Sequence, residues 1–244
     1  MCGSSYPYNK NNLWIFGDSH SAALQPAGAY LANKLDYTLF IFGKPGKLFP
    51  ANIFKIHEKY DLSKGYVKGL INEQQLAFRY FSTNVKKNDI VIITQRYPLY
   101  FGPNFTDSYD TNFKYIKFFD YDNKEINREK FYKLWLIELK KFIRFAESKS
   151  INVLVTNPLP EFPIIYDRNN FSNCGNNWYN LPFNKCQPEK KDISYNKDFY
   201  HNQKGIYKNF NNDLKLLEIR FSNFKVVDLF DTLCKSSSCN YSID

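Results

Sequence analysis

The feature that most constrains the fold is a continuous run of β-branched residues at Asp89–Thr94, which reads Asp-Ile-Val-Ile-Ile-Thr. Such a run is typical of a strand buried on both faces of a parallel sheet. Four further apolar runs have the length of strands, and they are Leu13–Phe16, Tyr37–Phe42, Ile151–Thr156 and Phe224–Leu229. Parallel strands need long crossover connections, which are usually helical.

Helical patterns lie between these five runs. They are Ser21–Leu35 with Pro26 bending or interrupting its first turns, Gly69–Val85, a segment capped by Asn127 and reaching Ser148, and Phe199–Phe221, helical at least from Tyr207. Two stretches, Gln95–Asn123 and Leu159–Lys197, are predicted to be irregular. The alternation predicts an α/β fold, a flavodoxin-like three-layer α/β/α sandwich around a five-stranded parallel sheet. We expect residues 1–12 to be an N-terminal extension and 13–244 to be a single domain.

Composition narrows the possible functions. The chain has 244 residues and a net charge of +9, and basic proteins often bind nucleic acid. Its lysines are scattered singly or in pairs, however, so we expect no nucleic-acid partner. The same charge suits an anionic polysaccharide or a membrane surface. No apolar run approaches the length of a membrane span.

The motif Gly17-Asp18-Ser19-His20 follows the first predicted strand. Ligands of such sheets bind at the carboxyl ends of the strands. Glycine allows a tight exit from the strand, and the serine hydroxyl can then attack a carbonyl while backbone amides stabilise the oxyanion. The plainer interpretation is that Asp18 or Ser19 only caps a helix. The position after the first of five strands favours a nucleophile.

Several stretches occur in a characteristic order, namely Gly17–His20, Lys44–Pro50, Asp89–Tyr97, Val153–Phe162 and Val226–Cys239 with its closing Cys-x4-Cys. Because these stretches follow one another in this order, the chain resembles the SGNH (GDSL-like) hydrolase superfamily. It looks most like the SGNH domain associated with membrane acyltransferases of family three, which O-acylate cell-surface polysaccharides. The resemblance implies serine-dependent O-acetyl transfer or ester hydrolysis on a polysaccharide, through an acyl-enzyme and without a cofactor or metal. It also implies a membrane acyltransferase as partner or fused domain.

The resemblance further implies roles for single residues. Ser19 is the expected nucleophile, and its amide and Gly46 are expected in the oxyanion hole, with Gly43 as the competing glycine. The superfamily places an asparagine donor after the third strand, where this chain has Gln95 and Arg96. Either of these replaces the asparagine, or the donor is absent.

The general base is the largest departure from the family pattern. The family's D-x-x-H motif is expected shortly after the closing cysteine pair, and the chain stops at Asp244, five residues beyond Cys239. We therefore expect a C-terminal truncation. Asp198 and His201 spell D-x-x-H and form an alternative base pair, but they precede the last predicted helix and strand. A non-catalytic glycan-binding or partner-docking module that has lost its base is the alternative function.

Two other histidines are not expected to act as the base. His20 follows the serine directly, and the side chains of adjacent helical residues point apart. His57 lies in a lysine-rich stretch that we interpret as a surface helix.

Cysteine spacing indicates an oxidising compartment. Local pairing predicts the disulfides Cys174–Cys186 and Cys234–Cys239, with Cys2 left over. A zinc site is the alternative, although neither pair has the C-x2-C spacing typical of one. We expect a periplasmic or other extracytoplasmic location, although no signal peptide is visible at the N-terminus.

Overall fold

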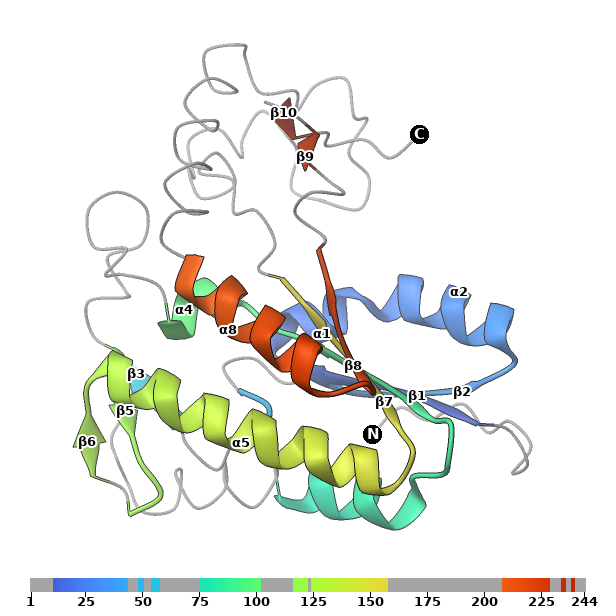
Figure 1. The fold of residues 1–244 in the computed structure, drawn as a ribbon, viewed down its shortest axis with the longest axis horizontal. Coiled ribbons are helices and arrows are strands. Elements are labelled where there is room, and N and C mark those ends of the chain that lie inside the picture. The colour runs from blue at the N-terminus through green and yellow to red at the C-terminus, as the bar shows by residue number, and fades with distance from the viewer. Residues whose placement is uncertain are drawn as a thin grey trace.

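The computed structural model describes residues 11–43, 48–50, 54–57, 75–101, 116–122, 124–157, 208–228, 234–235 and 238–239. Within these ranges the centre is a sheet of five parallel strands in the order β2-β1-β4-β7-β8 (Figure 1). The strands are β1 Asn12–Gly17, β2 Thr38–Gly43, β4 Ile90–Thr94, β7 Asn152–Thr156 and β8 Phe224–Val227. The predicted fold class is confirmed.

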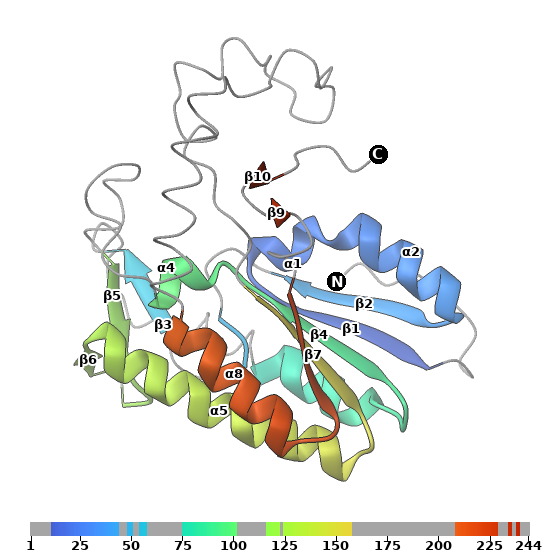
Figure 2. The same cartoon turned by 45° about the horizontal axis from the view of Figure 1, so that its top comes forward.

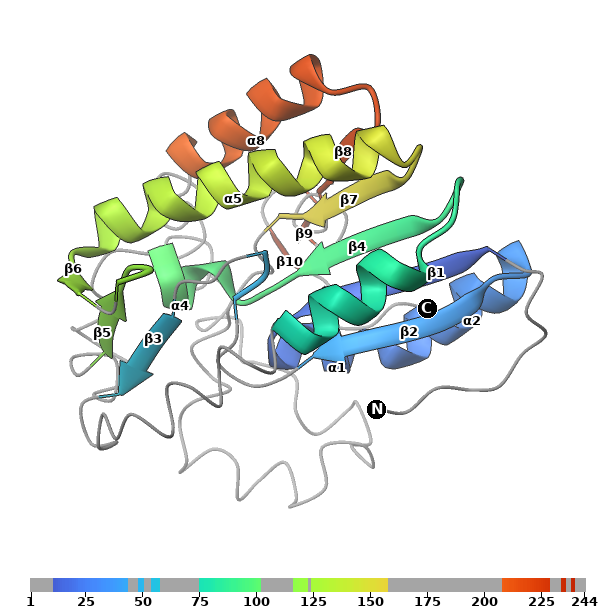
Figure 3. The same ribbon diagram turned by 90° about the horizontal axis from the view of Figure 1, so that it is seen from below.

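Helices cover both faces of this sheet (Figure 3). The labelled ones are α1 Ser19–Ala23, α2 Gln25–Leu35, α4 Tyr97–Phe101, α5 Arg128–Ser148 and α8 Lys208–Arg220, and residues 75–84 are also helical. The 75–84 helix, α5 and α8 pack on one face, where Trp14, Phe81 and Trp135 belong to one buried core. The α2 helix lies on the other face, where a side chain at Gly28 would collide with Ile15.

Two predicted helices are found close to their expected bounds. In α5 the side chain of Asn127 accepts a hydrogen bond from Lys130 N at 2.8 Å, so the predicted cap is confirmed. The segment predicted as Ser21–Leu35 is divided at Leu24 into α1 and α2. Pro26 stands at the start of α2, where the missing proline N–H costs no hydrogen bond.

Two predictions of local structure are wrong. His57 was expected on a surface helix, but it ends strand β3 Phe54–His57, which pairs with β5 Ile116–Phe119 in a small antiparallel sheet that β6 Glu125–Ile126 completes. The stretch Gln95–Asn123 was expected to be irregular, yet it contains α4 and β5. A buried aromatic contact holds β5 against α5, because Phe118 packs on Phe131 with ring centroids 4.6 Å apart.

The amino ends of β1 and β4 are joined by the fully buried carboxylate of Asp89. It accepts hydrogen bonds from the backbone N of Asn12 at 2.7 Å, Asn12 Nδ2 at 2.9 Å, Trp14 Nε1 at 2.8 Å and the backbone N of Lys86 at 2.9 Å. A buried carboxylate is stable only with such compensation. This acid therefore fixes the edge of the sheet opposite the carboxyl ends of the strands.

A two-stranded hairpin follows the main sheet in sequence. Its strands β9 Cys234–Lys235 and β10 Ser238–Cys239 are antiparallel, and their register places Cys239 directly opposite Cys234. Directly opposed residues of an antiparallel pair have neighbouring Cβ atoms. The backbone register thus suits the predicted Cys234–Cys239 disulfide, which stays a prediction.

Candidate active site

The turn between β1 and α1 depends on Gly17. Its φ of 151° lies in a region that side chains rarely adopt, and an added Cβ would overlap the carbonyl oxygen of Thr94 on the neighbouring strand. Only glycine allows β1 to approach β4 so closely and still turn into α1. The glycine predicted to permit a tight exit is placed at that exit.

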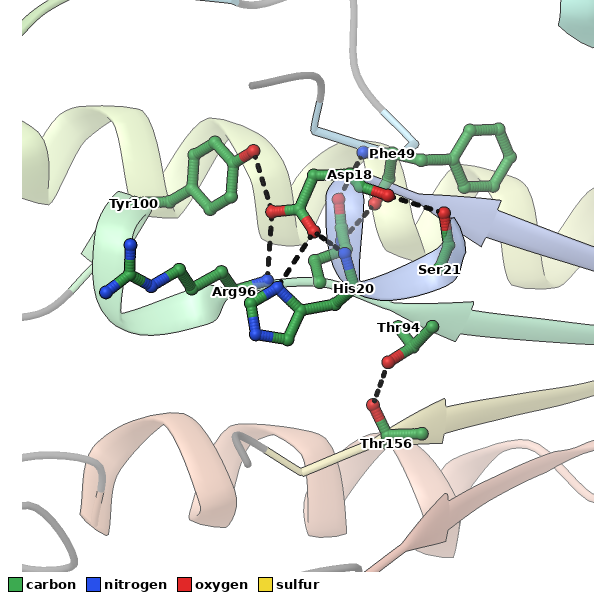
Figure 4. A network of polar contacts seen from close by, with 9 residues as sticks. Asp18, His20, Ser21, Phe49, Thr94, Arg96, Tyr100 and Thr156 are labelled. Carbon is green, nitrogen blue, oxygen red and sulfur yellow. Dashed lines mark hydrogen bonds and ion pairs between the residues drawn. The ribbon is translucent and has the colours of Figure 1, made fainter. Parts of the chain in front are cut away.

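Asp18 links this turn to the end of β4 (Figure 4). Its Oδ1 accepts a hydrogen bond from the backbone N of His20 at 2.9 Å, which caps α1. Its Oδ2 accepts from the backbone N of Arg96 at 2.9 Å and from the Tyr100 hydroxyl at 3.1 Å. Asp18 is 1% exposed, so it joins three segments from inside the protein.

The electrostatics of this cluster follow from its hydrogen bonds. Burial raises the pKa of Asp18, but hydrogen bonds from His20 and Arg96 lower this pKa by more than burial raises it. The pKa of Asp18 therefore lies below its usual value. Burial and the Asp18 charge raise the pKa of Tyr100 well above its usual range, so its hydroxyl stays protonated and donates. The His20 Nδ1 atom lies 3.3 Å from Asp18 Oδ1.

Ser19 is the first residue of α1 and is exposed, in contrast to its buried neighbour Asp18. Ser21 Oγ donates a hydrogen bond to the carbonyl of Asp18 at 2.6 Å, which fixes the turn from the other side. Gly43, at the end of β2, packs so closely that an added Cβ would overlap Ser21 Oγ. Ser19 therefore lies where α1 follows the carboxyl end of β1 (Figure 2), on a turn that is held by several contacts.

The side-chain amide of Gln95, predicted as an oxyanion donor, is already hydrogen-bonded within the protein. Its side chain is almost fully buried, and Oε1 accepts a hydrogen bond from the backbone N of Phe49 at 2.6 Å. Its Nε2 donates to the carbonyl of the same Phe49 at 2.7 Å. Both ends of the amide bind the backbone of one loop residue, and this geometry favours loop anchoring over the predicted donor role.

Sequence reasoning did not identify Tyr100 or Phe49 as residues that hold the site. Tyr100 lies within the stretch predicted to be irregular, and Phe49 lies in the loop after β2. The helical spacing of Tyr97 and Tyr100 is the one available signal, because residues three apart share a helix face. At the ends of β7 and β4, the hydroxyl of Thr156 donates a hydrogen bond to the hydroxyl of Thr94 at 3.0 Å (Figure 4).

Several predicted site residues lie outside the described residues, namely Gly46, Cys174, Cys186, Asp198 and His201. In the ranges that the structure does describe, no group of three or more His, Cys, Asp or Glu side chains could hold a metal ion. In those same ranges no helix has both the length and the apolar character needed to cross a membrane.

Comparison with protein-family models gives a match. A sequence model of the family described as "SGNH domain (fused to AT3 domains)" matches residues 2–244. No curated protein matches the chain. The match spans almost the whole chain, including the Gly17–His20 turn and the five-stranded sheet that carries it. The chain therefore belongs to the family of SGNH domains fused to AT3 domains, a family of the esterase and acyltransferase type.

Proposed function

We propose that this chain hydrolyses or transfers O-acetyl esters of a cell-surface polysaccharide through an acyl-enzyme on Ser19. The observation that carries the proposal is the exposed Ser19 on a turn whose neighbours Gly17 and Asp18 are fixed by buried contacts. A nucleophile must be exposed to substrate and yet held in one position, and this turn offers both.

The chemistry follows the usual route of a serine nucleophile. The Ser19 hydroxyl oxygen attacks the acetyl carbonyl carbon, its proton passes to a base, and the resulting oxyanion is stabilised by backbone amides. Collapse of the tetrahedral intermediate breaks the ester bond, and the base returns its proton to the departing oxygen, which leaves as the alcohol. A water molecule or an acceptor sugar hydroxyl then loses a proton to the base and attacks the acyl-enzyme, which releases acetate or the acetylated sugar and regenerates the serine hydroxyl. We assign the amides of Ser19 and Gly46 to the oxyanion hole.

The base is proposed to be a histidine of the D-x-x-H type with its acidic partner. The family pattern puts this motif after the closing cysteine pair, and Asp198 and His201 are the alternative pair within the chain, although they precede the last helix and strand. A serine needs such an imidazole, and the imidazole needs an acceptor that orients it.

The proposed partners follow from charge and family. The net charge of +9 favours an anionic polysaccharide or its membrane surroundings. The family's AT3 domains point to a membrane acyltransferase as the partner or the fused domain that supplies acetyl groups. We therefore place the reaction on the extracytoplasmic side of a membrane.

The test is turnover of p-nitrophenyl acetate and of an acetylated polysaccharide by the purified full-length gene product. Ser19→Ala is expected to lower kcat by about a thousandfold or more, because the nucleophile is lost. Ser148→Ala, at the exposed end of α5, serves as the matched control and leaves kcat unchanged. Equal turnover by the Ser19→Ala variant and the wild type would refute the nucleophile. Polysaccharide binding by a wild type without turnover supports the non-catalytic module instead.

A further inference from the structure

We propose that Gln95 is a positioning residue of this site, and that its buried amide sets the distance between the Ser19 turn and the loop segment around Phe49. This inference rests on the proposed function, because positioning is argued for the acyl-transfer site. It assigns Gln95 a role other than donating a hydrogen bond to the oxyanion.

The first observation is the pairing of Gln95 with Phe49. The amide oxygen of Gln95 accepts from Phe49 N at 2.6 Å, and the amide nitrogen donates to Phe49 O at 2.7 Å. This arrangement satisfies both backbone polar groups of the half-buried Phe49 through one side chain that is itself 2% exposed. A second donor, Trp135 Nε1, reaches Phe49 O at 3.1 Å. The loop segment is thus held by side chains and not by a strand ladder.

The second observation is that Gln95 also adjoins the nucleophile turn. An added Cβ at Gly17 would lie 3.0 Å from Gln95 Cγ, so the stem of the glutamine passes directly beside the glycine two residues before Ser19. The next residue, Arg96, donates its backbone N to Asp18 at 2.9 Å. The residues that follow β4 therefore contact the Ser19 turn in two ways, through the backbone of Arg96 and through the side-chain methylenes of Gln95.

The third observation is the aromatic packing that joins the two sides. The Phe49 ring stacks on Phe16, the residue before Gly17, with centroids 4.1 Å apart and planes at 13°. Phe49 also meets Phe142 of α5 edge-on at 5.0 Å. Rotation or withdrawal of the Phe49 backbone would therefore move a ring that supports the end of β1. Protein interiors are close-packed, so such a shift is felt by the adjoining turn.

In these contacts the Gln95 side chain both accepts and donates a hydrogen bond. Substitution by glutamate tests whether both hydrogen bonds are needed. In Gln95→Glu a protonated carboxyl group keeps one acceptor and one donor in the same places. After ionisation the group has only acceptors, and one oxygen then faces the carbonyl of Phe49. Burial and that facing carbonyl both raise the pKa of the introduced carboxyl, which in buried sites reaches about 8. The variant is therefore expected to hold Phe49 at low pH and to release it at high pH.

The experiment compares kcat and KM for p-nitrophenyl acetate in wild type, Gln95→Glu and Gln95→Leu, each as a ratio to wild type across about pH 5 to pH 9. We expect kcat of Gln95→Glu to fall about tenfold to a hundredfold at the alkaline end, with KM little changed, and to approach the wild-type value at the acid end. Gln95→Leu should stay low throughout, because leucine makes neither hydrogen bond. Gln75→Glu, on an exposed helical residue, is the control for the added charge. Urea unfolding at each pH identifies any variant that is not folded.

Hydrogen exchange of the Phe49 amide provides a second measurement that does not depend on turnover. Its exchange relative to wild type should rise in Gln95→Leu at every pH, and in Gln95→Glu only at high pH. A kcat ratio for folded Gln95→Glu that does not change with pH, or unchanged Phe49 exchange in Gln95→Leu, overturns the inference. If the wild type turns over no ester, the proposed function is refuted, and with it the role of Gln95 in positioning the catalytic site. Hydrogen exchange of the Phe49 amide then still decides whether Gln95 anchors the loop.

Discussion

Replacing Asp18 by asparagine should weaken both the fold and the proposed reaction. The carboxylate accepts three hydrogen bonds, from His20 N, Arg96 N and the Tyr100 hydroxyl. An asparagine has one acceptor oxygen, and it keeps most of these bonds when that oxygen occupies the Oδ2 position. Its NH₂ group then faces the N–H of His20, so the cap of α1 is lost.

The size of the expected loss in the free energy of unfolding follows from these contacts. Loss of a helix cap costs about 1 kcal/mol of stability. The bonds from Arg96 and Tyr100 change from charge-assisted to neutral, which costs about 1 kcal/mol each. Removal of a buried charge offsets part of this loss, because its desolvation no longer opposes folding. We expect Asp18→Asn to lower the free energy of unfolding by about 2 kcal/mol.

The assay is urea unfolding followed by circular dichroism, with Asp122→Asn as the control on an exposed aspartate. The pKa of Asp18 is lowered in the folded protein, so its stabilisation is present above the ordinary aspartate pKa of about 3.9. This stabilisation is lost as the pH falls through the lower pKa that Asp18 has in the folded protein. The stability difference between wild type and variant should therefore be full at neutral pH and should shrink in acid. A difference below about 0.5 kcal/mol at neutral pH would refute the reasoning.

Three further outcomes are expected. Asp89→Asn should lower the free energy of unfolding by about 3 kcal/mol in the same urea assay, because an amide cannot accept from all four donors. Gly17→Ala should yield a protein with little ester turnover and a stability loss of at least about 2 kcal/mol, since the added methyl overlaps the carbonyl of Thr94; wild-type stability and turnover would contradict the turn geometry. Cys234→Ser should expose Cys239 to thiol alkylation without reductant, whereas equal alkylation of Cys239 in the wild type would rule out their disulfide.

The sequence was sufficient to predict the sheet because its strands are local signals. Asp89–Thr94 is apolar and β-branched enough to indicate a buried parallel strand, and Asn127 is a standard helix cap. The Gly17–His20 turn was placed correctly for the same reason, since the motif directly follows a strand.

The contacts that hold the site could not be predicted, because they join residues far apart in sequence. Nothing near Gln95 indicates that its amide would bind Phe49, and its polarity equally suits an oxyanion donor. His57 was misplaced because its strand is stabilised by pairing with β5 and not by local propensity. Tertiary partners decided each of these cases.

Buried carboxylates hold the β1–β4 pair at both ends, Asp89 at the amino end and Asp18 at the carboxyl end. The six residues of β1 separate them by about 20 Å, at roughly 3.3 Å per residue. Substitutions this far apart, without shared partners, have additive effects on stability. A stabilising substitution at the amino end should therefore add its full effect to the free energy of unfolding, without changing the contribution that Asp18 makes beside Ser19.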